Sequence, residues 1–95
     1  QDSKLPTAYL YREYKAYCED YNMVAVNRKQ FTRSLKDEGY KTINTNFKVC
    51  TEHGKFRCNE DNCPDNYESK GRRGIKGLSM SDGEIPEFIR HIEAN

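Results

Sequence analysis

The chain has 95 residues, which gives room for one domain with one hydrophobic core. Its 16 Lys and Arg residues nearly balance 15 Asp and Glu residues, so overall charge neither favours nor excludes a polyanionic partner. No apolar run is long enough for a signal peptide or a membrane span, so we expect an intracellular protein with no membrane partner. The chain begins with Gln and not Met, and we therefore expect residues 1–95 to be a single domain excised from a longer protein.

A helix is predicted over residues 7–20, because apolar side chains recur there at helical spacing while charged ones fall elsewhere. Its apolar stripe consists of Leu10, Tyr14, Tyr17, Cys18 and Tyr21. We expect the tyrosines to belong to the core, because an aromatic ring buries a large apolar area whatever the function. Cys18 is expected to be a buried structural thiol. Thr7 is the candidate N-cap.

A second helix is predicted after a short link. Asn27 followed three positions later by Gln30 resembles a capping box that opens this helix, and Gly39 suits the left-handed position that ends it. One side of the helix is the packing side, with Phe31, Ser34 and Leu35. The opposite side is cationic and polar, and it carries Lys29, Thr32, Arg33 and Lys36.

Positive charge is concentrated in two stretches of the chain. Residues 27–48 contain six basic and two acidic residues, and residues 70–76 contain four basic residues and no acidic one. The tail from 81 to 95 is acidic on balance. We therefore expect the molecule to have one basic side, with the tail lying away from any phosphate backbone.

The second half of the chain is predicted to form two paired strands and a short helix. The first strand runs from Tyr40 to near Cys50, and Gly74–Met80 supplies the returning strand. The polar stretch between them, 51–70, is long for an irregular loop and offers no apolar anchor, so something should order it. A terminal helix is predicted over 84–93, with Pro86 in its first turn and with Ile85, Phe88, Ile89 and Ile92 as its apolar side chains.

Three short motifs, taken in order, resemble a known family. They are Leu10-Tyr11 with Tyr14 and Tyr17-Cys18, then Phe31, Leu35 and Gly39-Tyr40, and finally the run from Gly71 to Leu78. This order resembles the winged-helix domain at the carboxyl end of phage, plasmid and large-DNA-virus primase-helicases, whose motor belongs to helicase superfamily 3. Two features depart from the family pattern, namely Tyr17 where a Trp is common and the long stretch from Cys50 to Lys70.

The resemblance implies an α+β winged helix. Because residues 50–70 are longer than a plain wing, we expect them to form a Cys-rich insertion in that wing. The resemblance also implies a domain that binds duplex or origin DNA during replication, while the motor lies elsewhere in the same primase-helicase chain. A basic helix face beside a basic hairpin suits such a partner, because Arg reads guanine and Lys contacts phosphates. The candidate DNA-binding residues are Arg28, Lys29, Thr32, Arg33, Lys36, Lys41, Lys48, Lys70, Arg72, Arg73 and Lys76. The alternative is that these charges only solvate an outer face.

A second candidate site is a structural zinc centre. Cys50, His53, Cys58 and Cys63 follow the pattern C-x2-H-x4-C-x4-C, whose intervals match those of small zinc knuckles with His and the second Cys exchanged. Four such ligands within fourteen residues can close a tetrahedral Zn²⁺ site, which would order the loop and leave no open position for catalysis. The alternatives are free thiols in a flexible loop or a disulfide such as Cys58 with Cys63.

The sequence gives little support for catalysis in this domain. It has no phosphate-cradling glycine loop followed by Lys-Ser/Thr, no Ser/His/Asp set at a supporting spacing, and no acidic cluster spaced for two metals. We therefore expect a binding domain and not an enzyme. Two other binding roles stay open: a protein-interaction module that docks through its Cys-rich loop and terminal helix, and a stand-alone transcription regulator.

Overall fold

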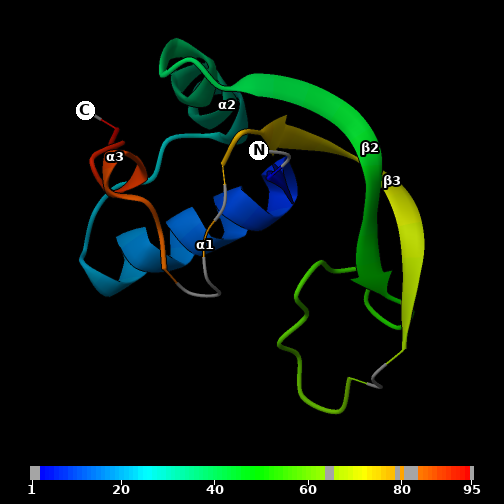
Figure 1. Ribbon diagram of the computed structural model, residues 1–95. Coiled ribbons are helices and arrows are strands. Elements are labelled where there is room, and N and C mark those ends of the chain that lie inside the picture. Colours follow the sequence, from blue (N-terminus) through cyan, green and yellow to red (C-terminus); the bar gives the residue numbers. More distant parts are fainter. Residues whose placement is uncertain (1–2, 64–65, 79, 81–83, 95) are drawn as a thin grey trace.

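The computed structural model describes residues 3–63, 66–78, 80 and 84–94. Within these residues the chain forms a mixed α/β domain with three helices and one three-stranded antiparallel sheet. The elements in order are β1 (Lys4–Pro6), α1 (Thr7–Asp20), α2 (Arg28–Asp37), β2 (Lys41–Cys50), β3 (Tyr67–Lys76) and α3 (Glu87–Arg90) (Figure 1). The predicted α+β class is therefore confirmed.

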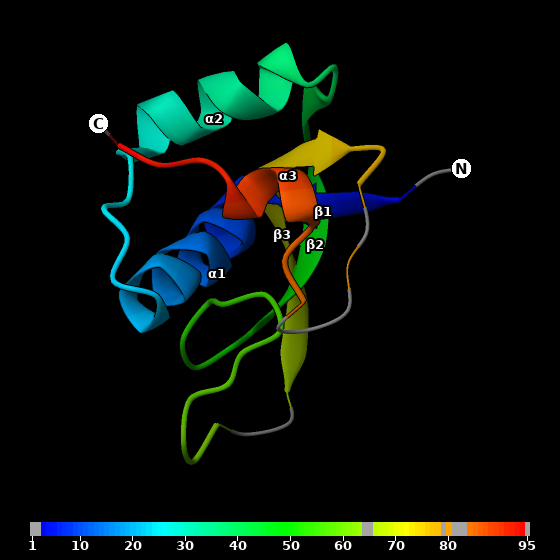
Figure 2. The same cartoon turned by 90° about the vertical axis from the view of Figure 1, so that its left-hand side faces the viewer.

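The sheet is built around a long hairpin. Strands β2 and β3 pair over ten residues each, from Lys41 opposite Lys76 to Cys50 opposite Tyr67. The short strand β1 pairs with the other edge of β3, which gives the order β1-β3-β2. The hairpin arches away from the helices, and the loop at its far end turns back toward α1 (Figure 1). Figure 2 shows α3 between α1 and α2, in front of the sheet.

Two strand predictions need correction. The returning strand was predicted over Gly74–Met80, but β3 begins at Tyr67 and ends at Lys76. Its first half is polar and exposed, so hydrophobic periodicity gave no signal there, although the backbone pairs with β2 throughout. Strand β1 was not predicted, because a three-residue segment is too short to show a period of two.

The two long helices form where the sequence places them. Helix α1 covers the predicted residues 7–20, and α2 opens at Asn27, whose side chain accepts a hydrogen bond from the Gln30 amide at 2.8 Å. Gly39, just beyond α2, has the expected left-handed backbone with a φ of +99°. The predicted Thr7 cap is wrong: Pro6 precedes the helix, and the buried Thr7 hydroxyl has no hydrogen-bond partner among the described residues.

The terminal helix is shorter than predicted. Only Glu87–Arg90 is helical, and Pro86 lies before the helix and not in its first turn. The flanking residues are held instead by tertiary hydrogen bonds, since the Ile92 carbonyl accepts from the Tyr14 hydroxyl at 2.8 Å. Farther along, the amide of Ala94 donates to the carbonyl of Val24 at 2.9 Å. Ile92 and Ala94 are therefore part of the folded domain.

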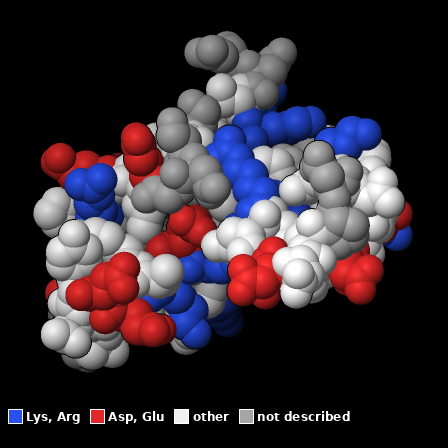
Figure 3. Space-filling model, turned by 90° about the horizontal axis from the view of Figure 1, so that it is seen from below, with Lys and Arg blue, Asp and Glu red and all other residues white. Residues whose placement is uncertain are grey.

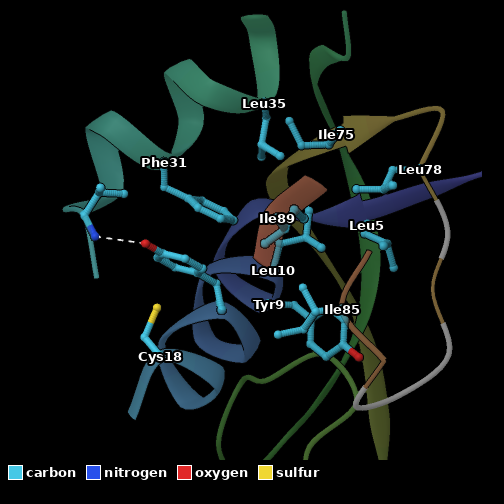
Figure 4. Close-up of a cluster of buried hydrophobic side chains, with 12 residues drawn as sticks. Leu5, Tyr9, Leu10, Cys18, Phe31, Leu35, Ile75, Leu78, Ile85 and Ile89 are labelled. Atoms are coloured by element: carbon cyan, nitrogen blue, oxygen red, sulfur yellow. Dashed lines mark hydrogen bonds between the residues drawn. The ribbon is translucent and has the colours of Figure 1, made fainter. Parts of the chain in front are cut away.

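The core lies between the helices and the part of the sheet that contains Leu5 and Ile75 (Figure 4). Tyr14 is fully buried and stacks on Phe31, with 4.9 Å between ring centroids. Its hydroxyl accepts a hydrogen bond from the Val26 amide, drawn as the dashed line in Figure 4, and burial raises the pKa of Tyr14 to about 12.

Cys18 is buried as predicted. Tyr21 is 64% exposed, so the predicted core stripe stops before it.

Candidate metal centre and nucleic-acid interface

The four predicted metal ligands lie together at the far end of the hairpin. Cys50 is the last residue of β2, and His53, Cys58 and Cys63 follow in the loop. One potential ligand atom from each lies within 4.8 Å of all the others. His53 Nδ1 is 3.5 Å from Cys58 Sγ and 3.8 Å from Cys50 Sγ. The tight turn after β2 produces this arrangement, because the Gly54 amide donates to the Cys50 carbonyl at 2.8 Å.

The thiols of this cluster have different acidities. Burial opposes ionisation of Cys50, but hydrogen bonds from the backbone of Lys55 and His53 outweigh it, and the pKa of Cys50 is lowered to about 6. Burial and hydrogen bonds with Cys58 and Cys50 raise the pKa of Cys63 to about 12. Only thiolates bind metals well. Without a cation, the cluster readily holds Cys50 as a thiolate, and that negative charge opposes ionisation of a second thiol beside it.

The Cys-rich loop is packed onto α1, contrary to the expectation that it has no apolar anchor. Phe56 makes edge-to-face contacts with Tyr9 and Phe47, at centroid distances of 5.1 and 5.8 Å. The Arg12 guanidinium donates to the carbonyls of Phe56 and Arg57, at 3.2 and 3.3 Å. Arg57 in turn donates to the Tyr9 hydroxyl and to the Met80 carbonyl. The sequence signal for this docking was Phe56, one of two aromatic residues in the polar stretch 51–70.

The cationic side of α2 faces a groove of about 800 Å³ that also reaches the sheet. Five predicted DNA-binding residues of α2 line it, and Arg73 of β3 closes it from the opposite wall. The complete lining is Thr7, Arg28, Lys29, Thr32, Arg33, Lys36, Asp37, Asn44 and Arg73. Thr7, Asp37 and Asn44 were not predicted to lie there, because only the tertiary fold brings α2 against the hairpin.

The groove is strongly positive. Five of its nine lining residues are Lys or Arg and one is acidic. In the part of the chain that the structure describes, the ion pairs are Arg12 with Glu13 and Lys55 with Glu60. None of the five cations that line the groove takes part in either ion pair. Elsewhere the charges are mixed, and the face seen in Figure 3 carries clusters of both signs.

The remaining predicted DNA-binding residues lie outside this groove. Residues that oppose one another on paired strands share a face, and successive residues alternate. On β3, Arg73 and Ile75 therefore share a face, whereas Lys70, Arg72 and Lys76 lie on the other one with Lys41 of β2. Lys48 shares the face of Arg73 but lies four residues beyond Asn44, toward the far end of the hairpin. The predicted single basic surface is thus divided by the sheet.

Comparison with known proteins places this small α/β domain in a viral replication family. The model of the family described as poxvirus D5 protein-like matches residues 1–69. The chain therefore belongs to the poxvirus D5 protein-like family, and the match is to a replication-related primase-helicase region. This confirms the relationship to large-DNA-virus primase-helicases, at the level of the family. The match covers the ligand cluster and α2, and it ends within β3, before Arg73.

No curated protein and no solved structure matched this chain significantly. Among the described residues, no helix has both the length and the apolar character that crossing a membrane requires.

Proposed function

We propose that this chain is a DNA-binding module of a replicative primase-helicase, that it has the winged-helix arrangement, and that it works within the cell as part of that longer chain. The observation that carries the proposal is the groove between α2 and β3, which five Lys and Arg side chains line. None of these five side chains forms an ion pair with a described residue. Such a density of unneutralised charge attracts phosphates and gains free energy from counterion release. Binding is the role of this domain, and catalysis belongs to other parts of the primase-helicase.

Duplex DNA suits the groove better than a single strand. The lining residues contain no aromatic side chain, and single-strand binding relies on aromatic rings that stack on the bases. Arg33 lies on the exposed side of α2 with its guanidinium available to a guanine edge, while Lys29 and Lys36 supply charge for phosphates. Asn44 adds a side chain that can pair with adenine.

The burial of α3 also supports DNA binding over protein docking through the terminal helix. Ile89 is fully buried, and Phe88 and Ile92 pack against the core. An apolar helix face that is already covered offers little surface to a partner protein. The order of α1, α2 and the β2–β3 hairpin, with β1 pairing on β3, supports our proposal of a winged-helix arrangement.

Fluorescence anisotropy with a labelled duplex across a salt series tests this function. We expect binding that weakens steeply with salt, with a slope of about 0.9 in log K per phosphate neutralised. Arg33→Ala should weaken binding by about 1 to 3 kcal/mol if Arg33 reads a base. Lys15→Ala is the control, because Lys15 is exposed on α1 away from the groove. Binding by Arg33→Ala as tight as that of the parent chain would show that Arg33 is not a contact residue.

We further propose that Cys50, His53, Cys58 and Cys63 hold a structural Zn²⁺ ion. The donor set of three thiols and one imidazole is one that zinc prefers, with bonds of about 2.3 Å to sulfur and about 2.0 to 2.1 Å to nitrogen. A sulfur and a nitrogen that bind the same ion are then separated by at most about 4.4 Å, and the Sγ–Nδ1 distances of 3.5 and 3.8 Å fall within that limit. A divalent cation would also favour the additional thiolates that the cluster alone resists.

Metal analysis of protein purified without chelator tests the zinc site. We expect about one equivalent of zinc in the parent chain and in Asn59→Ser, and none in Cys58→Ser. Asn59 is exposed and adjacent to Cys58, so it controls for the effect of changing this part of the loop. An absence of metal from the parent chain would leave the free-thiol interpretation.

A further inference from the structure

Three lysines lie directly opposite one another on the three adjacent strands of the sheet. Lys4 of β1 lies opposite Lys76 of β3, and Lys76 lies opposite Lys41 of β2. All three are exposed, and their position in register puts them on one face of the sheet. Opposed residues on paired strands have Cβ atoms about 5 Å apart, so this lysine row starts from neighbouring backbone positions and adds three positive charges to one face of the sheet, with the Lys4 ammonium reaching toward Thr45.

Among the described residues, none forms an ion pair with the lysine row. Lys4 donates a hydrogen bond to the Thr45 hydroxyl at 3.3 Å and lies near the ring of Phe47. Neither contact supplies a negative charge, and no ion pair within the described ranges involves any of the three lysines. Like charges placed directly opposite one another destabilise a sheet. A lysine row that forms no ion pair with the described residues is therefore suited to an anionic ligand.

The lysine row is separate from the groove beside α2. The next level of the sheet, with Leu5 opposite Ile75, lies on the other face and is buried beneath the helices. That buried face is the one from which Arg73 and Asn44 reach the groove. The two cationic surfaces are thus on opposite faces of the same sheet, and a straight duplex seated in the groove does not cross the sheet to reach the lysine row.

We propose that the lysine row of Lys4, Lys41 and Lys76 is a second phosphate-binding surface, which holds a second segment of duplex DNA while the groove holds the first. This inference rests on the proposed function of the groove. Its consequence is that the domain bridges two DNA segments, one on each face of the sheet. The row makes no base-reading contact, because Lys contributes point charges and not the planar fork of Arg. Binding there is therefore independent of sequence.

Stoichiometric titration at low salt tests the inference. The probe is a labelled 12-base-pair duplex of about 41 Å, at 3.4 Å per base pair, which matches the 39 Å longest dimension of the domain. We expect saturation at two duplexes per domain, confirmed by sedimentation velocity. The second duplex should dissociate on addition of salt with a slope of about 0.9 per phosphate contacted by the row.

The variant Lys76→Glu removes the second site without weakening the fold. It places a carboxylate between Lys4 and Lys41, so opposite charges replace like charges on both sides and the thermal midpoint should not fall. We expect this variant to bind one duplex with the parent's affinity for the first. Lys15→Glu changes the charge equally on α1 and should still bind two.

The possible outcomes separate the two proposals. Saturation of the parent chain at one duplex would overturn the second surface and leave the DNA-binding function intact. Two duplexes bound by Lys76→Glu would show that the second segment lies elsewhere and would overturn the assignment to the lysine row. A domain that binds no duplex at low salt would overturn both the function and the inference.

Discussion

At the scale of the residue, the Tyr14 side chain connects three separate segments of the fold. Its ring is fully buried against Phe31. Its hydroxyl accepts a hydrogen bond from the Val26 amide and donates one to the Ile92 carbonyl. One oxygen atom therefore connects α1 both to the link before α2 and to Ile92, which follows α3. The sequence places Tyr14 in the core, but the partners of its hydroxyl are 12 and 78 residues away and depend on the fold.

Replacing this tyrosine with phenylalanine isolates the role of the hydroxyl. In Tyr14→Phe the ring still fills the core, but the buried Val26 amide loses its acceptor. An unpaired buried donor costs about 1 to 3 kcal/mol, and we expect the free energy of unfolding in urea to fall by that amount. Tyr17→Phe is the control, because Tyr17 is half-buried on the same helix. An equal effect of both substitutions would contradict a special role for the Tyr14 hydroxyl.

At the scale of the element, Gly74 determines how the sheet closes. It lies on β3 where β1 and β2 both pair, opposite Pro6 and Ile43. A Cβ at this position would lie 2.7 Å from Cζ of Phe47 and 2.8 Å from the Leu5 carbonyl oxygen. The Phe47 ring therefore lies across Gly74, and the glycine allows a close approach between the strands and this aromatic side chain.

Substitution of the strand glycines tests that close approach. Gly74→Ala forces the Phe47 ring or the β1 backbone to shift, and overpacking of this kind costs about 1 to 3 kcal/mol. Gly71→Ala on the same strand is the matched control, because its Cβ would meet only the Asn46 Oδ1 at 3.6 Å. We expect thermal melting to show a much larger loss for Gly74→Ala. Similar midpoints for the two variants would mean that the Phe47 ring moves aside freely.

At the scale of the whole molecule, the Cys-rich loop and the core form one structure. Phe56 packs on Tyr9, and Arg12 and Arg57 join the loop to α1 and to the segment before α3. Cys50 lies at the base of this loop and is the last residue of β2. The protonation state of the Cys50 thiol is therefore linked to the stability of the entire domain.

The metal-free domain should become more stable as the pH rises from about 6 to about 9. The pKa of Cys50 is near 6 in the folded state and 9 in the unfolded state, so over this range the unfolded chain binds more protons. The contribution is complete above 9 and is lost as the pH falls through 6. Urea unfolding across this range, with Cys50→Ser as the comparison, measures it. A slope that persists in Cys50→Ser would assign the effect to another group.

The effect reverses at higher pH. The folded-state pKa of Cys63 is raised from 9 to about 12, so above pH 9 the folded chain retains a proton that the unfolded chain has released. The contribution of Cys63 is present below 9 and is lost between about 9 and 12. The two thiols together predict greatest stability of the metal-free form near pH 9.

The amino-acid sequence by itself determines the local features of this protein. Helical periodicity places α1, the Asn27 side chain opens α2, and Gly39 follows its end, because these depend on neighbours within a few residues. The spacing of Cys50, His53, Cys58 and Cys63 likewise predicts a cluster that forms within one loop. The order of these motifs also predicts the primase-helicase family, which the match over residues 1–69 confirms at the family level.

Only the tertiary structure decides how distant residues share surfaces. Strand alternation sends Arg73 toward α2 and its neighbour Arg72 to the other face, although the sequence presents them as one basic run. Lys4 joins Lys41 and Lys76 only because β1 pairs with β3 across more than 70 residues of chain. The polar half of β3 forms because its backbone pairs with β2, a contact that leaves no hydrophobic signature. These surfaces depend on strand register and packing, which residue types along the chain do not specify.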